Sequence, residues 1–169
     1  CRLYLKRTSD ATTATRLLTQ EVIDEAKKCQ GVGNYPFRKG SDGYHHIDED
    51  IALLKELGID IYRFSISWAR LYPQGDELEP NKEGIAFYDH IFKEVHKAGM
   101  KIFLTMNHYA VPLYLVENYG GWTNRKLVTF YERFAKTVFE HWGQYIDYFL
   151  PFNEINAGYF SPYNGVGLV

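Results

Sequence analysis

The sequence lacks three features, each of which would place it in a distinct class of protein. It has no basic stripe, because 19 Lys and Arg are balanced by 21 Asp and Glu, so the electrostatic footprint of a nucleic-acid binder is missing. No apolar run approaches the roughly 20 residues that span a bilayer. The basic residues near the N-terminus are not followed by the apolar stretch of a secretory signal. We therefore expect neither nucleic acid nor a membrane as a partner.

Cysteine is scarce, and the two that are present do not indicate a metal site. Cys1 and Cys29 have no metal-ligand spacing, and neither does the pair His45-His46. Two free thiols in a reducing compartment are the simpler interpretation, although a bond between the cysteines stays open. We therefore expect a cytoplasmic protein without a metal site at these residues.

Aromatic residues are abundant, with 14 Tyr and 11 Phe in 169 residues and a hydrophobic share of 46%. This composition is typical of a folded globular domain and not of a disordered chain. Most of the rings are expected in the core. A minority in loops could cover the apolar face of a sugar.

Three amphipathic helices are predicted from apolar residues at helical spacing, with Lys, Glu and Asp on the opposite side. Each helix meets a glycine at its end, at Gly58, Gly99 and Gly143, where a left-handed residue can close a helix. The apolar positions are Ile47, Ile51, Leu54 and Leu57 in the first helix, Ile85, Tyr88, Ile91, Phe92 and Val95 in the second, and Leu127, Phe130, Tyr131, Phe134, Val138 and Trp142 in the third.

A short run of β-type residues follows each glycine, at residues 59–66, 101–106 and 148–152. Helices that alternate with strands predict an α/β fold with right-handed crossovers and a parallel sheet. The apolar strands of such a sheet are expected to be buried on both faces. Residues 1–43 carry no such pattern, and we interpret them as an N-terminal loop and linker ahead of a domain formed by residues 44–169.

Polar side chains lie at or near the end of each predicted strand. The first strand carries Arg63, the second ends at Asn107-His108-Tyr109, and the third ends at Asn153-Glu154. Because the carboxyl ends of parallel strands share one edge, these groups are expected to converge there. Such a set suits recognition of a polyhydroxylated ligand, with the carboxyl group of Glu154 as a proton donor.

Each of these residues also has a structural interpretation. Glu154 could be a capping or surface carboxylate, and His108 could be a hydrogen-bonded histidine of the core or the rim. Arg63 is harder to explain in this way, because a buried guanidinium needs a carboxylate or equivalent acceptors. No acidic residue nearby in the sequence is an obvious partner, so the partner of Arg63 is expected far along the chain or outside it.

Five segments in order resemble glycoside hydrolase family 1, the retaining β-glycosidases, over roughly residues 42–169. Residues 152–154 look like the acid/base motif at the end of the fourth strand of that family. Ala110 departs from the pattern, because the family usually has Asp or Glu there. The segments are residues 62–70 (YRFSISWAR), 87–89 (FYD), 107–112 (NHYAVP), 120–125 (GGWTNR) and 152–154 (FNE).

The resemblance implies a (β/α)8 TIM barrel, of which this chain would supply about strands two to four, and a reaction without a metal or an organic cofactor. It implies that Glu154 is the general acid/base and that Asn153, His108 and Tyr109 bind substrate, Asn153 through the sugar 2-hydroxyl. It also places Arg63 against a nucleophilic carboxylate on strand seven. The first strand and everything after the fourth, including that nucleophile, are missing, so the fragment alone is expected to be inactive.

Residues that follow Glu154 favour one branch of the family. Ile155-Asn156, together with the segment from Gly121 to Leu127, looks like the bacterial 6-phospho-β-glucosidases. The expected partner is therefore a small β-glycoside, with a 6-phosphorylated glycone favoured. Two alternatives stay open: a plain β-glucosidase or β-galactosidase, and a non-catalytic carbohydrate-binding or interaction protein on a degenerate barrel.

Overall fold

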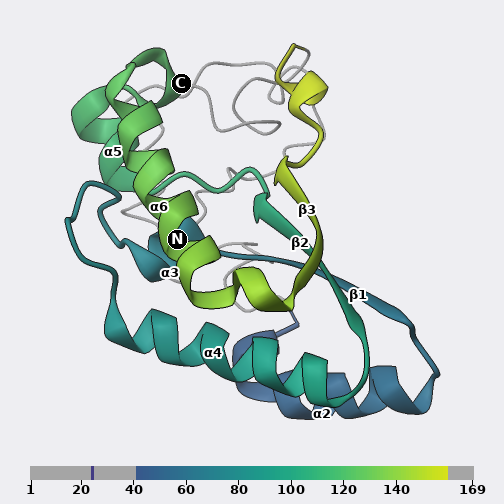
Figure 1. Cartoon of the computed structure of the whole chain (residues 1–169). Helices are drawn as coiled ribbons and strands as arrows, with labels where there is room; N and C mark the ends of the chain where they lie inside the picture. The colour runs from purple at the N-terminus through teal and green to yellow at the C-terminus, as the bar shows by residue number, and fades with distance from the viewer. Residues whose placement is uncertain (1–23, 25–40, 160–169) are drawn as a thin grey trace.

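The computed structural model describes residue 24 and residues 41–159, and it has a three-stranded parallel sheet as its centre (Figure 1). The strands are β1 (Ile61–Ser65), β2 (Lys101–Asn107) and β3 (Ile146–Phe152), in the order β1-β2-β3. Both pairings are parallel, with one register irregularity between Ile102 and Phe103. The predicted alternation of helices and parallel strands is confirmed. The linker predicted for residues 1–43 lies outside the described residues, apart from residues 24 and 41–43.

Three long helices lie where the apolar spacing predicts them. They are α2 (Gly43–Glu56), α4 (Lys82–Lys97) and α6 (Lys126–Trp142). The sequence analysis missed the two short helices, α3 (Trp68–Leu71) and α5 (Leu113–Tyr119). Three turns of 3-10 helix complete the described elements, namely η3 (Gly121–Thr123), η4 (Gly143–Tyr145) and η5 (Ile155–Tyr159).

The helix ends follow the glycine prediction in two cases of three. Gly58 and Gly99 have φ of 71° and 82°, in the left-handed region that only glycine adopts readily. The prediction for Gly143 is wrong, because its φ is −52° and the chain continues into η4. A right-handed 3-10 turn closes α6 there, so no left-handed residue is needed.

The start of α4 is fixed by a side-chain cap and by a close approach to α3. The side chain of Asn81 accepts a hydrogen bond from the backbone N–H of Gly84 at 2.9 Å, which satisfies one of the free donors of the first turn. A Cβ atom at Gly84 would lie 2.3 Å from the carbonyl oxygen of Arg70. Glycine at this position therefore allows the first turn of α4 to pack directly on α3.

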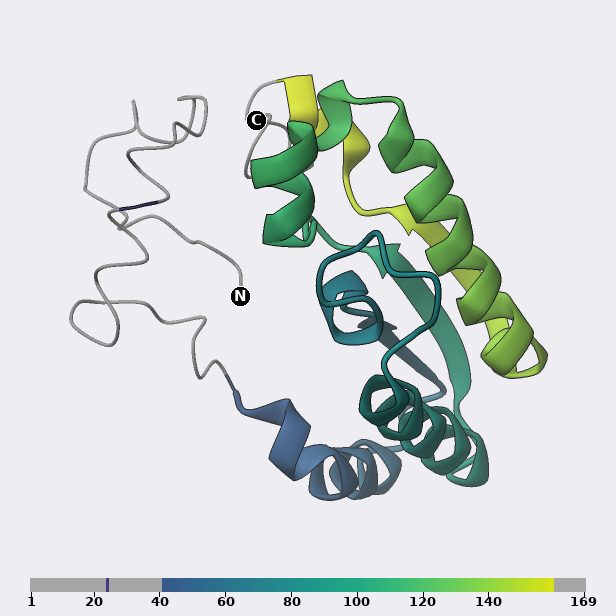
Figure 2. The same cartoon turned by 90° about the vertical axis from the view of Figure 1, so that its left-hand side faces the viewer.

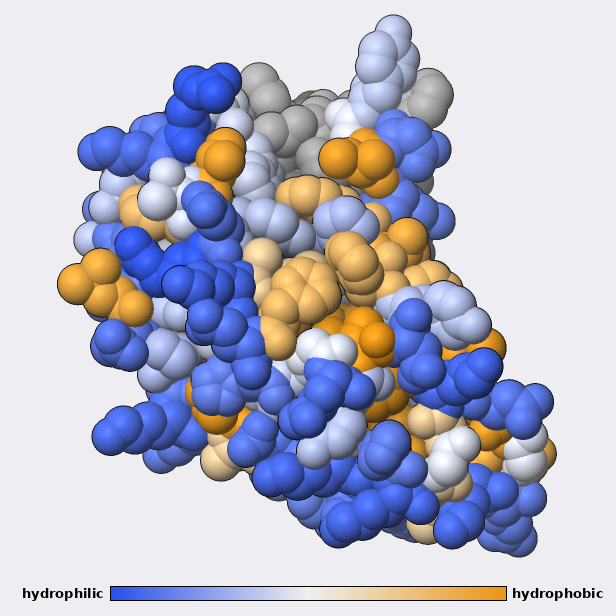
Figure 3. All heavy atoms as spheres, viewed as in Figure 1, coloured by the Kyte–Doolittle hydropathy of each residue, from blue (hydrophilic) through white to orange (hydrophobic). Residues whose placement is uncertain are grey.

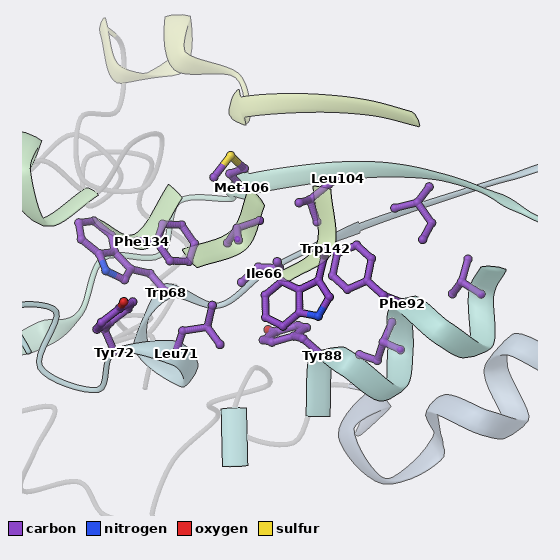
Figure 4. Close-up of a cluster of buried hydrophobic side chains, with 14 of the residues drawn as sticks. Ile66, Trp68, Leu71, Tyr72, Tyr88, Phe92, Leu104, Met106, Phe134 and Trp142 are labelled. Carbon is purple, nitrogen blue, oxygen red and sulfur yellow. The ribbon is translucent and has the colours of Figure 1, made fainter. Parts of the chain in front are cut away.

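An aromatic core joins α4 and α6 to one face of the sheet (Figures 2 and 4). Phe92 of α4 stacks on Trp142 of α6, with ring centroids 5.2 Å apart and planes 4° apart. Trp68 of α3 stacks on Phe134 of α6 at 5.5 Å. All four side chains are fully buried. Stacked aromatic pairs add to the stabilisation that burial of such large apolar surfaces provides.

The opposite face of the sheet is covered much less, and this corrects the expectation of strands buried on both faces. Only β2 is largely buried. On this face β1 exposes Arg63 and Ser65, and β3 exposes Tyr148 to about half. Phe149 is exposed to a similar extent but lies on the helix side, where its ring contacts Phe139 of α6. Figure 3, in the view of Figure 1 with α6 in front of the sheet, shows apolar atoms in the middle of the helix-side surface, bordered by hydrophilic side chains. Leu57 also departs from the prediction, since it lies beyond α2 and is 74% exposed.

Candidate active site

The carboxyl ends of the three strands lie side by side and carry a row of polar residues. Ser65 of β1 pairs with Thr105 of β2, and Asn107 of β2 pairs with Phe152 of β3. The chain leaves β3 through Asn153, whose backbone N–H donates to the carbonyl oxygen of Asn107 at 2.9 Å. The sheet therefore continues for one further hydrogen bond, and this bond fixes Asn153 at the rim.

Arg63 extends from β1 across β2 to the end of β3. Its Nε donates to Thr105 Oγ1 at 3.0 Å, and its Nη2 donates to Asn153 Oδ1 at 2.6 Å. The guanidinium carbon also lies 5.4 Å from the ring centroid of Phe103. The prediction that Arg63 is buried is wrong for this chain, because the residue is exposed on the poorly covered face of the sheet. Both partners within the described residues are neutral, so an acidic partner stays a prediction.

Asn153 is the buried member of this set, with 7% of its surface exposed. Its Oδ1 accepts from Arg63, and its Nδ2 donates to the hydroxyl of Tyr109 at 2.7 Å. Arg63 carries no acceptor, so the amide oxygen must face Arg63 and the amide nitrogen must face Tyr109. The protein thus fixes the orientation of the amide that the sequence analysis assigns to the sugar 2-hydroxyl.

Tyr109 links the second strand to the predicted acid. Its hydroxyl donates a hydrogen bond to Glu154 Oε2. Both residues have left-handed backbone, with φ of 66° at Tyr109 and 43° at Glu154. Left-handed backbone at a residue other than glycine costs free energy and occurs often at functional sites. The two turns bring side chains from the ends of β2 and β3 together.

Glu154 and His108 are the remaining predicted site residues. Glu154 follows β3 by two residues and is exposed, so the described residues leave its carboxyl group accessible to a ligand. His108 is half-buried, and its ring lies edge-on to that of Tyr109, with centroids 4.8 Å apart. The structure thus brings all five predicted site residues to one rim, while their roles toward a substrate stay predictions.

Two further residues lie at this rim, of which Thr105 was not proposed from the sequence and Asn107 was named only as part of the polar end of the second strand. Thr105 is 1% exposed and accepts from Arg63. Asn107 is 3% exposed, and neither of its amide atoms has a hydrogen-bond partner in the structure of the described residues. The alternation of side chains along the strand could have identified them, because residues two apart on a strand point to the same face. Thr105 and Asn107 share a face with Phe103, over which Arg63 lies.

Other residues of the recognised segments serve the core instead of the rim. The hydroxyl of Tyr88 accepts from the backbone N–H of Ser67 at 2.7 Å, and burial raises the pKa of Tyr88. The indole N–H of Trp142 donates to Asp89 at 2.6 Å. Trp122, predicted to pack, lies 5.5 Å from the ring of Phe152. These contacts tie the helices to the strands that carry the polar rim.

Residues 24 and 41–159 contain neither a candidate metal site nor a candidate membrane-spanning helix. No three His, Cys, Asp or Glu side chains gather there in a way that could hold a metal ion. In the same part of the chain, no helix is long and apolar enough to cross a membrane. What the described rim offers chemically is one accessible carboxyl group, a guanidinium, an imidazole, a phenol and two amides.

Comparisons with known proteins fit this arrangement. The model of the glycosyl hydrolase family 1 matches residues 27–168. The chain is 50% identical over 135 residues to 6-phospho-beta-glucosidase AscB of Escherichia coli, and 50% identical over 133 residues to aryl-phospho-beta-D-glucosidase BglH of Bacillus subtilis. These alignments cover 80% and 79% of this chain and 28% of each relative.

The fold of the chain is also similar to that of a solved structure. The structure of virulence factor SghA from Agrobacterium tumefaciens matches with a TM-score of 0.64 and 37% sequence identity. The match covers 67% of this chain and 25% of that one. With a family model that spans most of its length, the chain belongs to glycosyl hydrolase family 1.

Proposed function

We propose that the complete protein containing this chain hydrolyses β-glycosidic bonds with retention of configuration and that Glu154 is its general acid/base. The observation that carries the proposal is the place of Glu154, an accessible carboxyl group directly after β3 and next to the buried, oriented amide of Asn153. Carboxyl ends of parallel strands are where barrel enzymes place their catalytic groups. Family membership supports the reaction class.

The mechanism requires two carboxyl groups roughly 5 to 5.5 Å apart. Glu154 gives its proton to the leaving oxygen, and a second carboxylate attacks the anomeric carbon to form a covalent intermediate. Glu154 then takes a proton from a water molecule whose oxygen attacks the anomeric carbon, and the bond to the second carboxylate breaks and releases the sugar. The acid must hold its proton near neutral pH, which burial or the charge of the nucleophile would favour. The second carboxylate is proposed to lie on strand seven, beyond this chain, where it would pair with Arg63.

The fold proposal is a (β/α)8 barrel in which residues 44–169 supply strands two to four and residues 1–43 precede the domain. The open face of the sheet supports it. Asn107 is buried there without a partner for its amide, and an unpaired buried polar group costs about 1 to 3 kcal/mol. Further strands of a closed barrel would supply partners and cover β3. This 169-residue chain alone is therefore expected to be inactive.

The proposed substrate is a 6-phospho-β-glucoside, and the proposed location is the cytoplasm. Two relatives at 50% identity carry names that specify phosphorylated glucosides, which supports this choice over a plain β-glucoside or β-galactoside. Assays of the complete protein with matched phosphorylated and unphosphorylated aryl glucosides decide between them. Faster turnover of the phosphorylated substrate is expected, and the reverse order would transfer the proposal to the plain enzyme.

Replacement of the acid tests the proposed reaction. In the complete protein, Glu154→Gln is expected to lower hydrolysis of an unactivated β-linked disaccharide about 100-fold or more, since general acid–base catalysis contributes about that much. The matched control is Glu132→Gln, an exposed carboxylate on α6. Undiminished cleavage by Glu154→Gln would refute the proposal. A complete gene without a second carboxylate on strand seven would instead support a non-catalytic carbohydrate-binding protein.

A further inference from the structure

We propose that Tyr109 is a positioning residue for Glu154, at the end of a one-way chain of hydrogen bonds that begins at Arg63. The chain runs from Arg63 to Asn153, from Asn153 to Tyr109 and from Tyr109 to Glu154. The inference rests on the proposed function of Glu154 as acid/base. It gives Tyr109 a task different from the direct substrate contact that the family resemblance implies.

The direction of the chain follows from the chemistry of its members. A guanidinium has only donors, so Arg63 must donate to the amide oxygen of Asn153. The amide nitrogen then faces Tyr109, and because it also has only donors, it uses a lone pair of the phenol oxygen. The single proton of that phenol is left for Glu154. No link can run the other way while Arg63 remains charged.

Arg63, Asn153 and Tyr109 have contacts besides the chain itself, whereas the further contact of Glu154 is made by its backbone, whose carbonyl oxygen accepts from the N–H of Ala157 at 2.7 Å. Arg63 also donates to Thr105, and Asn153 is buried and bonded through its backbone to Asn107. The ring of Tyr109 packs edge-on against His108. Glu154, in contrast, is exposed, and a long carboxylate side chain in water samples many rotamers. The phenol therefore supplies the contact that selects one orientation of the carboxyl group.

The hydrogen bond from Tyr109 to Glu154 also affects the step in which Glu154 transfers its proton. When Glu154 gives its proton to the departing oxygen, the C–O bond to the sugar breaks and Glu154 becomes a carboxylate. A donor already aimed at that carboxylate stabilises the charge as it forms, and its alignment needs no rearrangement at that moment. Neighbouring bonds in a chain polarise one another, so the charge of Arg63 strengthens the last link.

A substitution that removes only the hydroxyl tests this role in the complete protein. Tyr109→Phe is expected to lower kcat/KM for an unactivated β-linked disaccharide about tenfold, a part of what general acid catalysis contributes. With a dinitrophenyl glycoside, whose leaving group departs without a proton, kcat/KM is expected to stay within about twofold of wild type, because kcat/KM reports the step in which that group leaves. The matched control is Tyr44→Phe, a tyrosine on α2 that is 46% exposed.

Two results would overturn the proposal. An equal loss for both leaving groups would indicate a damaged fold, and a raised KM with unchanged kcat would indicate that Tyr109 contacts the substrate instead. Failure of the proposed function is distinguishable, because wild type itself would then hydrolyse neither substrate.

A second measurement does not depend on activity. In the complete protein labelled with 13C at glutamate carboxyl groups, the resonance of Glu154 is expected to shift in Tyr109→Phe and to stay in place in Tyr44→Phe. The same Glu154 resonance in wild type and in both variants would refute the contact, whatever the kinetics show.

Discussion

The two faces of the sheet differ in how far the described residues cover them. On the helix side, α4 and α6 bury Phe92 and Trp142 completely, as Figure 4 shows. On the other side, Arg63 is exposed and reaches along the sheet to the end of β3. A strand–helix–strand unit carries its own half of the core, because the helix that follows a strand packs back onto it. Within the described residues no helix packs in this way on the face of Arg63, so one face of the sheet is covered and the other is exposed.

The largest expected effect is the difference in lost stability when an aromatic residue is replaced by alanine on each face of the sheet. Phe92→Ala on the helix side should destabilise the chain by about 3 to 5 kcal/mol, because it removes a fully buried ring and leaves a cavity. Tyr148→Ala, beside Phe103 on the other face and 49% exposed, should cost about 1 kcal/mol or less. Urea unfolding followed by circular dichroism measures both. Equal losses would mean that both faces are packed alike.

A pair of glycine substitutions sharpens the comparison on the helix side. Gly84→Ala should destabilise by about 1 to 3 kcal/mol, since the new Cβ would lie 2.3 Å from a backbone oxygen of α3. At Gly143 the nearest atom is 3.8 Å away and φ is −52°, so Gly143→Ala should stabilise by about 0.4 to 1 kcal/mol. Urea midpoints of the two variants against wild type check the signs. A gain from Gly84→Ala would contradict the close packing of α3 and α4.

Sequence reasoning succeeded where the determinants are local. The apolar spacing of α4 and α6 predicted the residues that form the core, among them Phe92 and Trp142, because helical periodicity and burial depend on neighbours within one element. It failed at the ends of helices, where the point at which a helix stops and the element that follows it determine the conformation. Leu57 has the right spacing but falls beyond the end of α2, and Gly143 needs no left-handed backbone because η4 continues the turn.

The site was predictable as a set of residues but not as a network. Arg63 and Glu154 were identified from their places on strands. The link through Tyr109 depends on two left-handed turns at residues other than glycine, for which the sequence carries no signal. The exposure of Arg63 also could not be predicted, because it depends on what covers that face of the sheet and not on the residues of β1.

The smallest expected effect is pH-dependent and probes the boundary between the two regions. Tyr131 of α6 donates to the carbonyl oxygen of Pro151, stacks on Phe152 at 4.9 Å and joins the core to the rim. Burial raises the pKa of Tyr131 and also that of Tyr88 above the ordinary value of 10.0. The unfolded chain therefore loses these phenol protons first, so stability is constant below about pH 10 and falls as the pH rises further. Urea midpoints between pH 8 and pH 11 measure the fall, which Tyr131→Phe should reduce because its ring cannot ionise. An identical fall in both proteins would mean that Tyr131 is as accessible to water as an unfolded tyrosine and that the core ends before it reaches the rim.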